Sequence, residues 1–241
     1  MPICKGSFAT FPAYSGDIIN IAARLRNVDF EFGEGIKCIA ADRNRTWIAG
    51  AAAVLECEIV QRKAVETIKY DDAESKLLTV KTVREKVNTF RYDPATGIAE
   101  TAGSFRDFAI FAEAMQRSGA GKDFEPRPML VDMLAWVQAV VAMYPTAQLG
   151  RVVVDNLYVE PRCIGQYSAK TVDNRLDMAY LETVAGQIRS IKLAFFDEGC
   201  RCSIEATAKA TLTVTSSDEE DVDHLFIEQR AVMLEHSTGG E

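Results

Sequence analysis

The side chains best suited to holding a metal ion are Cys200 and Cys202, together with the neighbouring pair Asp223 and His224. Alternate positions of a β-strand point to one face, so the two cysteines would lie side by side. Structural zinc sites usually combine a C-x2–4-C pair with a second matching pair, and the sequence lacks that second pair. The other histidine, His236, falls in a C-terminal segment expected to be frayed. We therefore expect no metal site and interpret the cysteines as small core residues of a strand.

Nucleophilic and acid–base chemistry have no stronger support. A cysteine or serine nucleophile needs a base within reach, usually histidine, and both histidines lie late in the chain among acids. The acidic groups at residues 71–72 and 218–221 could serve acid–base or magnesium chemistry, but a turn and a helix N-terminus already favour acids there. We assign no catalytic residue and no cofactor. A hydrolase that uses dispersed acids with Cys200 and Cys202 is the weakest of the functions considered.

Basic and aromatic residues gather between Arg43 and Tyr92, where the sequence has ten bases and seven acids. A sheet face that mixes bases and aromatic rings can bind phosphates and stack nucleobases. The candidate nucleic-acid-binding residues are Arg43, Arg45, Trp47, Lys81, Arg84, Lys86, Arg91 and Tyr92. The simpler interpretation, which the small charge excess favours, is a solvated sheet face whose lysines discourage edge-to-edge association.

Hairpin signals organise the region that contains these bases, residues 62–103. Two polar turns, residues 71–75 and 93–97, separate three runs rich in Val, Ile, Thr, Phe and Tyr, which is the composition of strands. Pro94 fixes φ at the second position of a type I turn, and Gly97 supplies the positive φ that returns the chain. The sequence therefore predicts antiparallel strands joined by tight turns.

Helices are expected at several places around these strands. Their expected positions are residues 15–25, 104–117, 129–144, 172–185 and 217–234, with a strand as the alternative for the first. Ser15, Ser104 and Ser217 are suited to N-cap positions, because a serine side chain can accept from an unpaired amide of the first turn. Runs of strands followed by single helices predict an α+β fold, in which helices cover largely antiparallel sheets.

The glycine- and proline-rich stretch at residues 118–128 is the best candidate for a domain boundary. It predicts an N-terminal sheet-and-helix unit over residues 1–118, a linker over residues 119–128 and a C-terminal unit over residues 129–241. One continuous domain is the alternative. Both halves show the order hairpin, strand, cap and helix at low residue identity, so a duplication and a chance similarity both remain open.

Composition and charge exclude several classes of protein. With 48% apolar residues the chain can bury a substantial core, which excludes global disorder. The first residues lack the pattern of a secretion signal, and the longest apolar run, residues 129–144, is shorter than the ~20 residues of a membrane-spanning helix. We therefore expect a cytoplasmic protein. Most of the net charge of -8 lies in residues 218–241, which hold eight acids and one base.

The sequence thus predicts a non-catalytic binding or self-assembling subunit of an intracellular complex. Hairpin-rich sheets leave unpaired edges, so its partner would be a second copy or another protein. The main alternative is a nucleic-acid- or nucleotide-binding protein that uses the face of residues 43–92. No motif identifies a known family.

Overall fold

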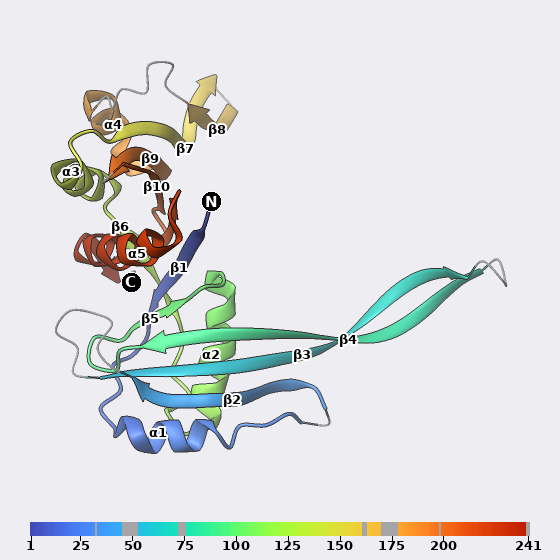
Figure 1. Cartoon of the computed structure of the whole chain (residues 1–241). Coiled ribbons are helices and arrows are strands. Elements are labelled where there is room, and N and C mark those ends of the chain that lie inside the picture. Colours follow the sequence, from blue (N-terminus) through green and yellow to red (C-terminus); the bar gives the residue numbers. More distant parts are fainter. Residues whose placement is uncertain are drawn as a thin grey trace. The chain divides into compact units, whose positions relative to one another are not determined.

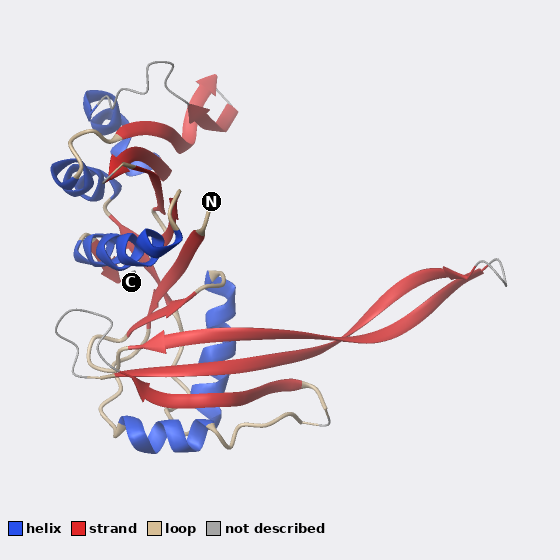
Figure 2. Ribbon diagram, viewed as in Figure 1, coloured by secondary structure: helices blue, strands red, loops and turns tan. Residues whose placement is uncertain are grey.

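The computed structural model describes residues 1–31, 33–44, 53–71, 76–160, 163–169, 178–197 and 199–239 of the chain. The predicted fold class is confirmed: the chain is α+β, with antiparallel strands in sheets and helices packed on them (Figure 1, Figure 2). It forms two compact units, which we call the middle unit (residues 11–126) and the terminal unit (residues 1–10 and 127–241). Among the described helices, none has the length and apolar character needed to cross a membrane.

The two compact units bear on the predicted domain organisation. The second change from one unit to the other falls at Pro126, inside the predicted linker of residues 119–128, and residues 1–10 group with the C-terminal half of the chain. A grouping by contacts does not test whether the predicted units fold independently, so the predicted domain boundaries stay a prediction.

The middle unit is a small sheet with two helices. Its elements are α1 (Ile18–Leu25), β2 (Gly35–Asn44), β3 (Val54–Asp71), β4 (Lys76–Tyr92), β5 (Ile98–Thr101), the 3-10 helix η1 (Phe105–Asp107) and α2 (Phe108–Arg117). The strands are antiparallel and follow the order β2-β3-β4-β5. Helices α1 and α2 contact each other, and both contact β2 and β3. The α1 N-cap is Asp17, two residues after the predicted Ser15, because the Asp17 carboxylate accepts from the Ile19 amide.

The turn between β4 and β5 forms as the sequence predicts. Asp93 accepts hydrogen bonds from the amides of Ala95 and Gly97, and the Asp93 side chain is buried. Gly97 has a φ of 75°, and a Cβ atom built on it would lie 2.2 Å from the carbonyl oxygen of Phe11. The turn therefore requires glycine for two reasons, its positive φ and the close approach of another backbone segment.

Aromatic rings fill the core between the middle-unit sheet and its helices. The Phe111 ring on α2 stacks on Phe90 of β4 with centroids 5.3 Å apart and meets Phe11 edge-on, also at 5.3 Å. Tyr92 and Phe124 complete the cluster around Phe111, at 5.7 and 5.9 Å. Because aromatic pairs add to the stability gained from burial alone, this cluster anchors β4 to α2.

Strands β3 and β4 extend far beyond the rest of the middle-unit sheet (Figure 1). Pairing of β2 with β3 ends at Arg62, and β5 pairs only with Phe90–Tyr92 of β4. Residues 63–71 and 76–84 therefore pair only with each other within the middle unit, as a two-stranded ribbon that we call the arm. A two-stranded ribbon by itself is at best marginally stable in water, so the arm depends on the sheet from which it projects.

The terminal unit is a larger sheet. Its elements are β1 (Ile3–Thr10), β6 (Arg127–Val131), α3 (Met133–Met143), β7 (Gln148–Glu160), β8 (Cys163–Ala169), α4 (Met178–Val184), the 3-10 helix η2 (Ala185–Gln187), β9 (Ile188–Asp197), β10 (Cys200–Thr207), β11 (Thr211–Ser216), α5 (Glu219–Glu235) and β12 (Ser237–Gly239). The antiparallel order is β12-β6-β1-β11-β10-β9-β7-β8. Helix α5 packs against β1 and β11, and α3 packs against β9 and α5. Gly199, with a φ of 87°, takes its predicted place in the turn between β9 and β10.

Two expectations about the terminal unit are wrong. The helix expected over residues 129–144 begins only after Asp132, whose carboxylate caps it by accepting from the amides of Leu134 and Ala135 at 3.1 and 3.0 Å. The apolar residues before Asp132 form β6 instead. The tail after Glu235 is also ordered, because Ser237–Gly239 pairs with β6. In both cases strand pairing takes residues whose local sequence predicted helix or coil.

We expect Phe111→Ala to destabilise the middle unit by about 3–5 kcal/mol, since it empties a fully buried ring site at the centre of the aromatic cluster. Phe105→Ala removes the same atoms from a ring that is 37% exposed and should cause a much smaller loss. Urea denaturation followed by circular dichroism measures both. Equal losses for the two variants would show that the cluster does not anchor the sheet.

Candidate functional site

The structure describes six of the eight candidate nucleic-acid-binding residues and divides them between two faces of the sheet. Directly opposed residues of neighbouring strands share a face, and faces alternate along each strand. By the register of β3 and β4, one face carries Lys81 and Arg91, and the other carries Arg84, Lys86 and Tyr92. Arg43 is exposed near the end of β2. Arg45 and Trp47 lie outside the described residues. The assignment of this set to nucleic acid stays a prediction.

Lys81 and Arg91 take part in ion pairs across the two strands. Lys81 Nζ lies 3.4 Å from Glu66 Oε1, and Arg91 Nε donates to Glu56 Oε1 at 3.0 Å. Each base is the register partner of its acid. Exposed pairs of this kind contribute ~0–1 kcal/mol, but they neutralise the positive charge of this face.

The side chains of Lys86 and Tyr92 both form hydrogen bonds with other groups of the middle unit. Lys86 donates to Asp107, whose other carboxylate oxygen accepts from the Ser104 amide at 2.7 Å. Burial raises the pKa of Asp107, but the hydrogen bonds from Lys86 and Ser104 outweigh it and hold the pKa below its ordinary value. Tyr92 is 1% exposed, and its hydroxyl donates to the Pro12 carbonyl at 2.7 Å. Its ring therefore belongs to the core.

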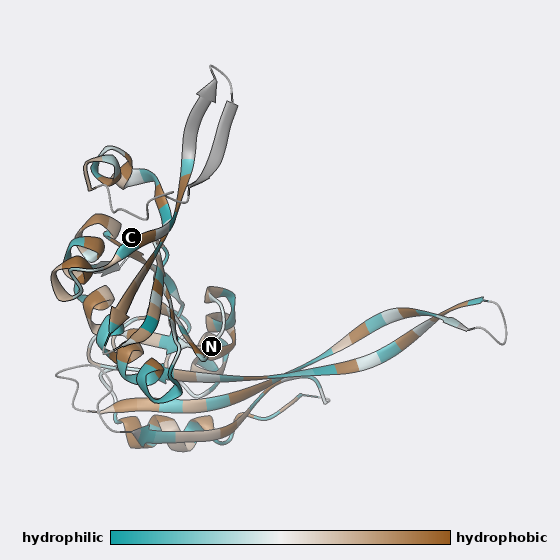
Figure 3. Cartoon of the chain, turned by 45° about the horizontal axis from the view of Figure 1, so that its top comes forward, coloured by the Kyte–Doolittle hydropathy of each residue, from teal (hydrophilic) through white to brown (hydrophobic). Residues whose placement is uncertain are grey.

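Beyond these residues, the arm presents two exposed faces of different character. The apolar arm face consists of Ala64, Glu66, Ile68, Tyr70, Leu77, Thr79, Lys81 and Val83. The basic arm face consists of Lys63, Val65, Thr67, Lys69, Leu78, Val80, Thr82 and Arg84, and the register places the pair Asp71 and Lys76 at its outer end. Figure 3 shows hydrophobic and hydrophilic residues alternating along both strands of the arm. Among the described residues, no acid pairs with Lys63, Lys69 or Arg84, in contrast to Lys81 on the opposite face.

Lys63, Lys69 and Lys76 are arm bases that the sequence-based selection omitted. They share a face with Arg84, which was selected. Register is the signal that could have found them, because counting outward from the predicted turn at residues 71–75 assigns every arm residue to a face. The selection instead followed the density of bases and aromatics along the chain.

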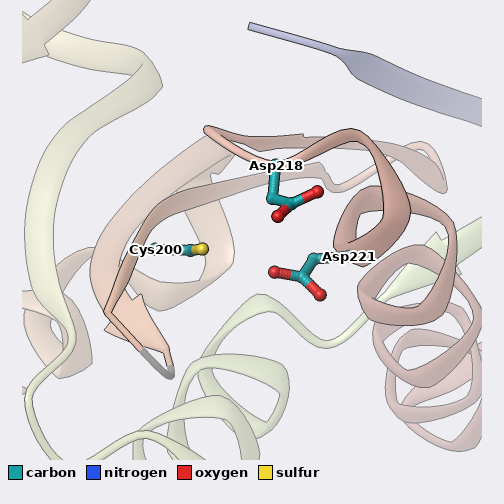
Figure 4. Close-up of side chains that lie close together, drawn as sticks. All are labelled: Cys200, Asp218 and Asp221. Carbon is teal, nitrogen blue, oxygen red and sulfur yellow. The ribbon is translucent and has the colours of Figure 1, made fainter.

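In the terminal unit, Cys200, Asp218 and Asp221 direct their side chains toward a common space (Figure 4). One sulfur and one oxygen from each acid all lie within 4.8 Å of one another. Local structure explains much of this group. Asp218 is the N-cap of α5 and accepts from the Glu220 amide at 3.0 Å, as acids at helix N-termini do. Three donors, one of them a cap, are fewer than a structural zinc site needs, and the expected absence of metal stays a prediction.

Neither the Cys200 thiol of this group nor the neighbouring Cys202 thiol is activated as a nucleophile. A hydrogen bond with the Asp221 carboxylate raises the pKa of Cys200, and burial raises the pKa of Cys202. A thiolate is the reactive form of cysteine, so both shifts lower reactivity at neutral pH. An adjoining cavity of about 280 Å³ is lined by Asp197, His224 and Glu228 among other residues. Its three carboxylates, those of Asp197, Asp221 and Glu228, could hold a cation.

Another hollow of the terminal unit is a groove of about 1050 Å³ on the sheet. Some of its polar side chains pair with one another: Arg151 donates to Glu205, and the hydroxyls of Ser203 and Thr215 lie 2.6 Å apart. Lys192 and Arg201 also line the groove.

Acid should remove the contribution of Asp107. Its pKa is depressed in the folded state, so its contribution is complete above the unfolded value near pH ~4 and disappears as the pH falls through the folded value. We expect Asp107→Asn to destabilise the protein by about 1–2 kcal/mol at neutral pH, with a smaller difference from the unsubstituted protein at about pH 3. Urea titrations at both pH values test this. The exposed Asp123→Asn is the control, and a difference that does not depend on pH would contradict the assignment.

Cys200 should react slowly with alkylating reagents, and Asp221→Asn should accelerate the reaction, since the amide no longer holds the thiol proton. Peptide mapping by mass spectrometry after timed iodoacetamide treatment reports the rate at Cys200 alone. The matched control is Asp223→Asn, on the same helix but outside the group. An unchanged rate in Asp221→Asn would show that the carboxylate does not control the thiol.

Comparisons of this chain with known protein families and with curated proteins find no match. The functional conclusion therefore depends on the physical features of the two units.

Proposed function

We propose that the protein is a non-catalytic binding subunit that assembles with a second copy of itself through the apolar arm face. The observation that carries this proposal is the exposure of large apolar side chains on that face. Ile68 and Leu77 are each 68% exposed, and Tyr70 and Val83 are each 58% exposed. Exposed apolar surface of this kind, here with the ion pair Glu66–Lys81 within it, marks interaction sites in proteins.

Burial of this face would also stabilise the arm. Full burial of a side chain the size of Leu or Val contributes about 1.5–3 kcal/mol. Among the described residues of the middle unit, neither a third strand nor a helix covers the arm, and an isolated ribbon is marginal in water. A partner that covers the apolar arm face supplies the missing layer at the ~10 Å spacing of packed sheets.

The register makes this face complementary to itself. In a contact with two-fold symmetry, residue i meets j and j meets i. If the two-fold axis runs along the ribbon between two stacked arms, each residue lies against the register partner of its counterpart. Glu66 then meets Lys81 of the second copy, and Tyr70 meets the second copy's Leu77. Opposite charges and apolar groups are thus matched without any change in the arm.

An enzyme finds less support than this binding role. The thiols of the Cys200 region have raised pKa values, and in the groove Arg151 pairs with Glu205 and Ser203 with Thr215. On the arm, by contrast, large apolar side chains are exposed, and no described element of the middle unit covers them.

Leu77→Glu should weaken self-association at least about tenfold, because it places a charge against Tyr70 of the second copy in the apolar part of the contact. The matched control is Leu78→Glu, the same substitution one residue along the strand on the opposite face. It should leave self-association nearly unchanged. Sedimentation equilibrium of each full-length variant gives the association constants, and circular dichroism confirms the fold.

A charge exchange tests the symmetry of the contact. Glu66→Lys alone should weaken association, and Glu66→Lys combined with Lys81→Glu should restore it. A monomeric unsubstituted protein, or equal effects of Leu77→Glu and Leu78→Glu, would contradict the proposal.

A further inference from the structure

The opposite side of the arm carries a different kind of surface, and from it we infer that the basic arm face binds the phosphates of duplex DNA. This inference goes beyond self-assembly, because it uses the face that the second copy leaves uncovered. It is drawn from a difference in charge pairing between the apolar arm face and the basic arm face. The arm bases of the apolar arm face include an ion-paired Lys81, whereas Lys63, Lys69 and Arg84 are exposed and have no acidic partner among the described residues.

Two of these bases lie in an unfavourable arrangement. Lys63 and Arg84 are register partners, so two positive side chains stand directly opposite each other on adjacent strands. Like charges in this position destabilise a sheet. On the other face, neighbouring register partners carry opposite charges, as in the ion pair of Arg62 with Glu85. An anion between Lys63 and Arg84 would turn the repulsion into two attractive contacts.

The spacing of the bases suits an extended polyanion. Lys69 lies six residues beyond Lys63, which is about 20 Å along a strand. That length spans about six base-pair steps of 3.4 Å along a duplex. The two strands of a ribbon lie ~4.8 Å apart, and the B-DNA major groove, ~12 Å wide, admits a two-stranded ribbon. A single small anion would use only one end of this face.

The length of the arm also separates Lys69 from the body of the middle unit. The net charge is -8, which by itself repels nucleic acid. Lys69 stands seven residues beyond Arg62, where β2 pairing ends, at a distance of about 23 Å. The Debye length at physiological ionic strength is ~8 Å, so the middle-unit body's charge is largely screened at that point. A basic face on a projecting ribbon can therefore bind a polyanion without strong repulsion from the middle-unit body.

The test is the salt dependence of binding to a short, fluorescently labelled DNA duplex, measured by anisotropy with the full-length protein. Each phosphate contact adds about -0.9 to the slope of log K against log salt concentration. Lys63→Gln combined with Arg84→Gln should reduce the magnitude of the slope by about 1.8 and weaken binding at low salt. Leu78→Glu, which adds an acid beside Lys69, should also weaken it.

The matched control combines Arg62→Gln with Lys81→Gln, which removes the same charge from the opposite side of the same strands. It should leave the slope unchanged. Leu77→Glu should retain DNA binding, which separates this inference from the proposed self-assembly. The inference is overturned by absence of binding at low salt, by an equal loss in the control, or by equal affinity for polyglutamate or for an RNA duplex, whose deep, narrow major groove does not admit the ribbon.

Discussion

The hydrogen-bonded register between β3 and β4 is the constraint on which the rest of the middle unit depends. It pairs every residue from Leu55 with Tyr92 to Asp71 with Lys76 without a bulge. Because side chains alternate between faces, a shift of one residue would move each of them to the other side. The buried rings would then point to solvent, and the cross-strand ion pairs would be lost. Burial of Phe90 and Tyr92 at one end thus determines which residues the arm exposes at the other.

The same two strands change their role along their length. Near β5 they are central strands of a sheet, covered by helices and held by aromatic stacking around Phe111. At Lys86 the base still finds a buried partner, Asp107, on η1. One step further toward the tip, Lys63 and Arg84 have no helix beside them that could provide an acid in the described structure. From the core to the arm, the bases on this face therefore change from ion-paired to without a partner among the described residues. This change occurs where the covering helices end.

In the terminal unit, by contrast, several polar groups cap helices or bond to one another. Acids such as Asp132 and Asp218 cap helices, and the hydroxyls of Ser203 and Thr215 bond each other. The one cluster with mixed chemistry, around Cys200, keeps its thiol protonated through Asp221. These polar groups thus stabilise the fold, whereas the arm of the middle unit exposes apolar and basic side chains.

The sequence by itself determined the fold class, the tight turns at Gly97 and Gly199 and the extent of the helix after Ser104, because φ preferences, capping and apolar periodicity act over a few residues. Tertiary structure decided three other features. Strand pairing with Ser237–Gly239 drew residues 129–131 out of the predicted helix. The covering helices, which end near Lys86, made β3 and β4 a projecting ribbon. The long-range pairing then sorted the bases, with Lys81 beside Glu66 and Lys63 opposite Arg84. Composition places these residues in one region, but only the register, which depends on contacts between distant segments, decides which of their charges are neutralised and which remain available.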